Sequence, residues 1–454
     1  MELLEKINSI VWGLPALAAI LGVGLYLSLG TGFAQFRYFP KALKSFVQLL
    51  HPKTGEKGES SRQALFTALA ATVGTGNLVG VAGAICLGGP GAVFWMWIAG
   101  CLGMCTKFCE AMLAVRYRKI SDGETVGGPM YMITQGLGRR WWPMAAIYAV
   151  FGLVASFGVG NATQINSASE GIQAILAGFG IRVNLMGKIL IGCFMAALIV
   201  VLLMGGGKQI GRSTEKLVPF AAGAYILLCL CALVINRKQL PQAFFSIVAG
   251  AWDPRAATGG LVGSLFVALR VGCARGVFTN EAGLGTAGIA HAAAEVEHPL
   301  QQGLMGIMEV FLDTLVICSM TALVILTSGV PIPYGTDAGA VLATRAFSAI
   351  FGDWAGIIIS LSLCLFALAT VLGWGLYGGR CAQFLFGGKF WRSFVLAQGI
   401  TVILAAVTEP GIVWLGAEIV NGLMAIPNLI ALAGLSPEVI RLIKDYEKRS
   451  PSVG

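Results

Sequence analysis

The chain has 454 residues, of which 56% are hydrophobic and only 12% are charged. A soluble protein of this length could not bury so much apolar surface, because much of any folded chain must face water. The composition therefore excludes an ordinary soluble domain and indicates that lipid is the main solvent. We expect the net charge of +9 to come from Lys and Arg in cytoplasmic loops, without a nucleic-acid partner.

Apolar stretches long enough to cross a bilayer recur along the whole chain. They predict an all-α membrane protein with eleven transmembrane helices, at 10–30, 63–85, 91–116, 142–174, 185–204, 215–236, 261–291, 303–328, 354–386, 391–407 and 411–434. The predicted domains are an N-terminal helix with a basic loop (1–62), two five-helix blocks (63–236 and 261–434) and a cytoplasmic tail (435–454).

Basic residues predict the orientation. If the N-terminus is outside, most of the 31 Lys and Arg fall in segments that lie inside, within 37–62, 116–140, 208–216, 380–392 and 441–449. Positive residues favour the cytoplasmic side of short loops. We therefore predict a multi-pass protein of the cell (plasma or inner) membrane, with its N-terminus outside and its C-terminus in the cytoplasm.

The two five-helix blocks are nearly equal in length. Because five is odd, the second block must enter the membrane from the side opposite to the first. This arrangement predicts an inverted repeat, a common plan of secondary transporters.

The first helix of each block contains a run of glycines and polar residues. Residues 70–80 read AATVGTGNLVG, and residues 276–286 read GVFTNEAGLGT. Such runs allow a membrane helix to unwind, and the freed backbone groups are tolerated in lipid only where they line a cavity or bind something. Freed carbonyls suit a cation and half-helix N-termini suit a carboxylate, so the pair predicts a site for an ion and an amino acid. Close helix packing is the alternative explanation for these glycines.

At these residues the sequence resembles the alanine/glycine:cation symporter family, also called sodium:alanine symporters. The resemblance covers nearly the whole chain, and its motifs are 71–77, 127–131, 279–285 and 373–374. It implies a leucine-transporter-like fold, with five-plus-five inverted repeats after one extra helix.

The resemblance also implies roles for individual residues. Substrate-binding residues would be Thr75, Gly76, Asn77, Gln164, Phe278, Thr370 and Trp374. Sodium ligands would be Thr72 and Asn77 at one site, and Ala70, Val73, Ala367 and Thr370 at a second. Trp374 could instead be an anchor at the membrane interface. The stripe of small and polar residues around Gln164 could instead be a contact between helices.

Several ionisable residues lie inside predicted spans, where charge is costly. We expect Lys107 to pair with Glu110 three residues on, and Glu281 to hold the second break through hydrogen bonds. Glu309 and Asp313, one turn apart, form either a proton relay or pairs with basic residues elsewhere.

The sequence thus predicts sodium-coupled symport of a small neutral amino acid, alanine or glycine, into the cell by alternating access. Sodium is the expected coupling ion, and no oligomer is required. A proton-coupled symporter is the alternative. We expect no enzyme activity, because the sequence offers no His/Glu metal pair and no Ser–His or Cys–His arrangement in a plausible span.

Overall fold

Nearly all of the regular structure is helical, as the apolar composition predicts. The computed structural model describes residues 2–50, 59–121, 123–253, 258, 264–336, 339–352, 354–408 and 411–449. Within these ranges, the strands are β1 (Lys119–Ser121) and β2 (Glu124–Val126), an antiparallel pair in which Ile120 lies opposite Thr125.

The N-terminal region contains a broken first helix and an amphipathic helix. Its elements are α1 (Glu2–Val11), α2 (Leu14–Gly30), α3 (Ala34–Arg37) and α4 (Phe39–Leu50). Gly13 separates α1 from α2, and a side chain there would meet the carbonyl oxygen of Ser9 at 2.6 Å. On α4, the exposed residues Leu43, Val47 and Leu50 share one face.

The first predicted five-helix block follows. Its helices are α5 (Glu59–Thr72), η1 (Thr75–Asn77), α6 (Val79–Gly88), α7 (Gly91–Arg116), α8 (Pro129–Tyr131), η2 (Met132–Leu137), η3 (Arg139–Trp141), α9 (Trp142–Phe157), η4 (Gly158–Ala162), α10 (Thr163–Gly178), α11 (Leu185–Met204) and α12 (Gly206–Ile235).

The second predicted block begins after a short linking helix. The helices from there to the C-terminus are η5 (Arg237–Gln239), α13 (Leu240–Trp252), α15 (Leu265–Asn280), α16 (Thr286–His291), α17 (Pro299–Val310), η6 (Phe311–Cys318), α18 (Ser319–Thr327), α19 (Gly339–Phe351), α20 (Trp354–Phe386), η7 (Gly388–Phe390), α21 (Trp391–Val407) and α22 (Gly411–Arg449).

Ten candidate membrane spans occur in the described ranges, if the pair Ser60–Thr72 and Thr75–Gly88, bent by 57°, is counted as one span beside the nine others. The predicted count of eleven is therefore not confirmed. The predicted span 261–291 is divided into α15 and α16, of 16 and 6 residues, and its first residues lie outside the described ranges. The prediction of an all-α membrane protein is confirmed.

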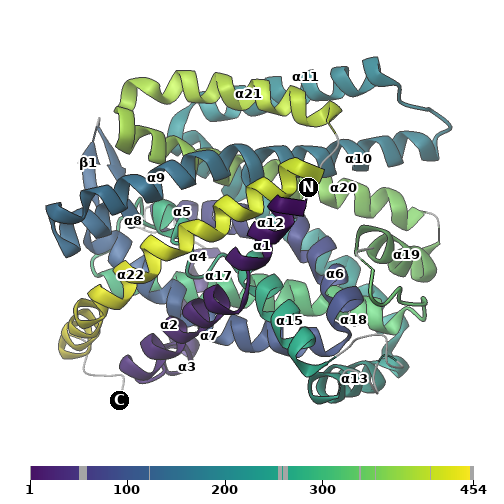
Figure 1. The fold of residues 1–454 in the computed structure, drawn as a ribbon, viewed down its shortest axis with the longest axis horizontal. Coiled ribbons are helices and arrows are strands. Elements are labelled where there is room, and N and C mark those ends of the chain that lie inside the picture. The colour runs from purple at the N-terminus through teal and green to yellow at the C-terminus, as the bar shows by residue number, and fades with distance from the viewer. Residues whose placement is uncertain are drawn as a thin grey trace.

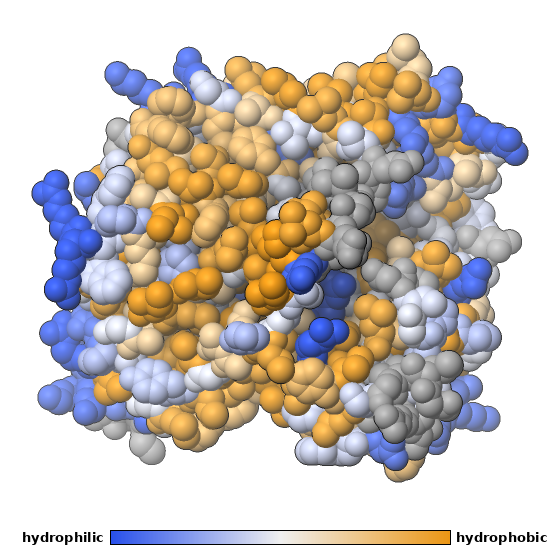
Figure 2. Space-filling view, in the orientation of Figure 1, coloured by the Kyte–Doolittle hydropathy of each residue, from blue (hydrophilic) through white to orange (hydrophobic). Residues whose placement is uncertain are grey.

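Long helices cross one another around a buried interior. Figure 1 shows α11 and α21 side by side at the top of the view, far from α7 and α15 below, while α22 runs diagonally across the front. Helix α7 packs against α15 and α17, and α20 packs against α9 and α10. Apolar side chains cover much of this face around a small hydrophilic hollow near its centre, and many hydrophilic side chains gather toward the left and right edges (Figure 2). Such a belt is typical of a protein surrounded by lipid.

Candidate functional site

The first break lies between α5 and α6. Helix α5 ends at Thr72, and the backbone N–H of Gly74 donates to the side-chain oxygen of Asn77 at 2.8 Å instead of continuing the helix. As a result, the carbonyl oxygens of Ala70, Thr72 and Val73 accept no hydrogen bond within the described part of the chain. Free carbonyls at a helix C-terminus carry partial negative charge, which suits a cation.

The second break comprises residues 281–285, between α15 and α16. Glu281, Gly283 and Gly285 all have positive φ, of 53°, 93° and 79°. Within the run 276–286, the break begins only after Asn280, because α15 remains helical to that residue. A side chain at Gly276 would lie 3.3 Å from the backbone of α7, so this glycine permits close helix contact.

Glu110 of α7 holds the second break. One of its carboxylate oxygens accepts hydrogen bonds from the backbone N–H groups of Gly283 and Gly285, at 3.0 and 3.1 Å, and from Asn428 of α22 at 2.7 Å. The expected pairing of Lys107 with Glu110 was therefore wrong. The other carboxylate oxygen of Glu110 has no hydrogen-bond partner within the described residues.

Lys107 instead forms a buried ion pair with Glu309 of α17, at 3.0 Å. The other oxygen of Glu309 lies 2.9 Å from His291 of α16, and the second ring nitrogen of that histidine lies 2.7 Å from Gln302. Ser61 of α5 donates to Gln302 at 2.5 Å. This chain of polar groups ties together both broken helices, α7 and α17.

Glu281 fulfils the role that the sequence predicts for it. Its carboxylate accepts hydrogen bonds from Thr286 at 2.6 Å and from the indole of Trp374 at 3.0 Å. The left-handed residue at the end of α15 is thereby fixed to the next half-helix and to α20.

Asn77 is fully buried, and its side chain bridges two elements. Its amide nitrogen donates to the carboxylate of Asp313 at 2.5 Å, and the other oxygen of that carboxylate accepts from Thr314 at 2.8 Å. Asp313 lies on η6, and it forms no ion pair within the described residues. The first break is thus adjacent to a buried carboxylate without a basic partner.

Apart from Trp374, which contacts Glu281 and Gly160, the predicted substrate residues meet at this break. The hydroxyl of Thr75 donates to the side-chain oxygen of Gln164 on α10 at 3.1 Å. A side chain at Gly76 would lie 3.3 Å from Thr279 and 3.9 Å from Phe278, so α15 packs directly against the break at this glycine. Five of the seven predicted substrate residues are buried, and the other two, Gly76 and Phe278, are half-buried. Buried polar groups therefore surround the first break.

Trp374 is completely buried in the middle of α20. A side chain at Gly160 of η4 would lie 2.2 Å from its Cβ atom, so only a glycine allows this approach. Full burial excludes the alternative role as an interfacial anchor.

Phe278 lies toward a separate cavity of about 280 Å³. This outer cavity is also bounded by Trp12, whose ring lies 6.3 Å from the Phe278 ring in an edge-to-face arrangement, and by Arg275, which lies 3.6 Å from Glu418. Phe278 therefore separates the outer cavity from the break at Gly76.

The predicted sodium ligands include one buried hydroxyl that has no partner. Thr370 of α20 is 2% exposed, and its hydroxyl has no hydrogen-bond partner among the described residues. A side chain at Gly74 would lie 2.8 Å from this oxygen, which places Thr370 directly against the first break. Ala367 lies one turn earlier on α20 and is also buried. An unpartnered oxygen beside unpaired carbonyls fits a hard cation well.

The other predicted sodium site, formed by Thr72 and Asn77, has fewer free oxygens for an ion. The side-chain oxygen of Asn77 already accepts the backbone N–H of Gly74, and its nitrogen faces Asp313. Sequence reasoning left Asp313 either in a proton relay or paired with a basic residue, and it did not predict its contact with Asn77. Two glycine-containing runs indicate which helices unwind, whereas the neighbours of each run depend on how α17 and η6 pack.

Comparisons with known proteins place the whole chain in one family. The model of the sodium:alanine symporter family matches residues 1–453. The sodium/alanine symporter AgcS of Methanococcus maripaludis is 42% identical, and the match covers 99% of this chain and 97% of that protein. The amino-acid carrier protein AlsT of Bacillus subtilis is 37% identical, with 95% and 89% covered.

A solved structure shows the same fold. The crystal structure of MhsT in complex with L-phenylalanine aligns with a TM-score of 0.57 and 14% identity, over 84% of this chain and 97% of that one. At this identity the likeness concerns the fold alone, which is the leucine-transporter-like fold.

Proposed function

The chain belongs to the sodium:alanine symporter family of membrane-embedded secondary transporters, and we propose that it carries alanine or glycine into the cell together with sodium. Membership of this family makes it an amino-acid symporter and not an enzyme. The coupling ion, the substrate, the orientation and the inverted repeat are parts of the proposal.

One observation carries the choice of sodium. The buried, unpartnered hydroxyl of Thr370 lies against the first break, where the carbonyls of Ala70 and Val73 accept no hydrogen bond in the described part of the chain. Leaving such groups unpaired in a buried site costs free energy, which a bound cation would recover. These oxygens, with the carbonyl of Ala367, are the proposed ligands of one sodium ion. Thr72 and Asn77 are the proposed ligands of a second.

The substrate is proposed to bind beside the ion, with its carboxylate near Thr75, Gly76 and Asn77. The side-chain oxygen of Gln164 would accept a hydrogen bond from the substrate ammonium group. That bond would replace the one it now accepts from the Thr75 hydroxyl. Phe278, Thr370 and Trp374 would form the walls. A pocket closed by the large rings of Phe278 and Trp374 would favour a substrate with a small side chain.

Coupling follows from the adjacency of ion and substrate. A cation near the carboxylate lowers the cost of removing that carboxylate from water, so each ligand favours the binding of the other. In alternating access, one bundle then rocks against the other around the occupied break. The bonds of Glu110 and Glu281 to the second break are suited to keeping it intact during this motion.

The test is an uptake screen with purified protein in liposomes. We expect alanine or glycine to accumulate only with an inward sodium gradient, and replacement of sodium by potassium to abolish accumulation. Unchanged uptake in potassium would reject sodium coupling. Larger neutral amino acids are tested in parallel. Equal uptake of these would reject the proposal that the pocket selects a small side chain.

Proton coupling is the second candidate, and Asp313 is the observation that favours it. This buried carboxylate contacts Asn77 and forms no ion pair within the described residues, whereas Glu309 is paired with Lys107. If protons drive transport, uptake should follow an inward pH gradient with sodium absent, and Asp313→Asn should remove that dependence.

A further inference from the structure

The structure contains a large basic cavity on the face where α7 and α22 end. The cavity measures about 690 Å³ and lies far from the first break, between the end of α7, the segment joining α16 to α17, and the last turns of α22. Its lining includes two acidic residues, Glu297 and Asp445, and six basic residues: Arg116, Arg118, Arg441, Lys444, Lys448 and Arg449. Arg116 and Arg441 share Glu438 as an ion-pair partner, and Arg449 pairs with Asp445. The positive charge that favours an anionic ligand therefore comes mainly from Arg118 and the two lysines.

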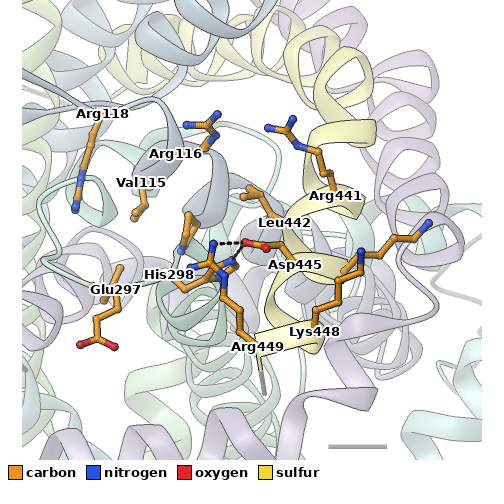
Figure 3. A pocket seen from close by; sticks show the side chains of 13 residues that line it. Val115, Arg116, Arg118, Glu297, His298, Arg441, Leu442, Asp445, Lys448 and Arg449 are labelled. Carbon is orange, nitrogen blue, oxygen red and sulfur yellow. Dashed lines mark ion pairs between the residues drawn. The ribbon is translucent and has the colours of Figure 1, made fainter. Parts of the chain in front are cut away.

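Figure 3 shows how these side chains are arranged. Asp445 lies between His298 and Arg449, 3.5 Å from the former and 3.0 Å from the latter. Lys448 extends along the side of the cavity, and neither it nor Lys444 forms an ion pair within the described residues. The two lysines therefore remain available to an added anion.

His298 supplies an independent sign of a missing ligand. It is 6% exposed, and its Nδ1 atom accepts the backbone N–H of Leu300, which caps the start of α17. Burial lowers the pKa of His298, so the ring is neutral and its hydrogen is on Nε2. Nε2 has no hydrogen-bond partner, since Asp445 at 3.5 Å is too distant and poorly placed. A buried N–H donor at a basic cavity lacks an acceptor.

The neighbouring helix α4 indicates the depth of the cavity in the membrane. Tyr446 packs against the ring of His298 at 5.1 Å, and its own ring lies 4.3 Å from the ammonium of Lys41 on α4. One face of α4 exposes apolar side chains, and a helix of this kind lies in the interface between lipid tails and headgroups. The cavity is therefore at the level of the lipid phosphates.

We infer that this cavity binds the phosphate headgroup of an anionic phospholipid. Phosphate oxygens accept hydrogen bonds from guanidinium, ammonium and imidazole groups, and basic pockets between transmembrane helices on the cytoplasmic side bind such headgroups. The phosphate accepts the Nε2 hydrogen of His298 and is neutralised by Lys444 and Lys448. Bound there, it links α22 to the segment that follows α16, next to the second break.

The inference is tested on the full chain, delipidated in detergent and titrated with dioleoylphosphatidylglycerol. Binding is measured by native mass spectrometry and by the shift in Tm. A basic residue near an anionic surface contributes roughly a factor of five in affinity, so Lys444→Gln with Lys448→Gln should weaken binding roughly 25-fold. The matched control, Lys389→Gln with Arg392→Gln, removes the same charge from exposed positions and should change binding less than twofold.

A second variant keeps the inference testable if the double lysine variant fails to fold. His298→Asn preserves an acceptor for the helix cap and removes the Nε2 donor, and it should weaken binding roughly tenfold. Equal retention of phosphatidylglycerol by wild type and variants would overturn the inference. So would equal stabilisation by dioleoylphosphatidylcholine, or by inorganic phosphate alone, which would indicate a free anion in place of a lipid.

Discussion

Replacing Thr370 with valine keeps the shape of the side chain and removes the hydroxyl that faces the first break. In most buried sites this change destabilises a protein, because a hydrogen bond is lost. Here the hydroxyl has no partner among the described residues, so the ion-free protein loses no hydrogen bond. An unsatisfied buried polar group costs about 1–3 kcal/mol, so the variant should unfold at the same temperature as wild type or about 2 °C higher in potassium.

Sodium binding should respond in the opposite direction. A ligand oxygen interacting with a charge contributes about 1.5–3 kcal/mol, so its loss should raise the sodium concentration for half-maximal alanine uptake roughly 10- to 100-fold. The assays are thermal unfolding in potassium and in sodium, and uptake over a range of sodium concentrations.

A buried threonine in an ordinary environment serves as the control. Thr321 donates to the backbone of its own helix at 3.1 Å and lies 2.7 Å from the hydroxyl of Tyr225. Thr321→Val should therefore lower Tm in both salts and leave the sodium half-saturation unchanged. The reasoning is refuted if Thr370→Val lowers Tm in potassium and leaves sodium half-saturation within twofold of wild type.

Two further changes test the surroundings of the site. Gly160→Ala should abolish uptake, since its methyl group would overlap Trp374, while Gly223→Ala, which meets nothing within 4 Å, should be neutral in uptake and unfolding assays. Lys107→Met should destabilise the protein by about 3–5 kcal/mol by leaving Glu309 buried and unpaired, and adding Glu309→Gln should restore much of that loss in denaturant unfolding. A double variant less stable than Lys107→Met would argue against this pairing.

Much of the fold could be predicted from the sequence, because lipid imposes a simple requirement on each span. Three predicted spans coincide with helices of the structure: 185–204 with α11, 354–386 with α20 and 391–407 with α21. The apolar runs there end near glycines, prolines or charged residues. The bend of the second predicted span was also foreseen, because its polar residues have no role in a continuous helix.

Predictions failed where the partner lay on another helix. Lys107 and Glu110 are three residues apart and could pair, but Lys107 pairs with Glu309 of α17, while one oxygen of Glu110 accepts the backbone N–H groups of Gly283 and Gly285. The sequence also does not separate the glycines of the run 276–286 by role, because a glycine that unwinds a helix and one that permits contact with α7, such as Gly276, look alike. The meeting of Asn77 with Asp313 likewise depends on helix packing that spacing does not reveal.

The central claim is that the first break holds an ion and an amino acid next to each other, and equilibrium binding in detergent tests it without transport. Radiolabelled alanine should bind with a Kd at least tenfold lower in sodium than in potassium, and alanine should raise the affinity for sodium by the same factor. Equal affinity for alanine in both salts would contradict the claim.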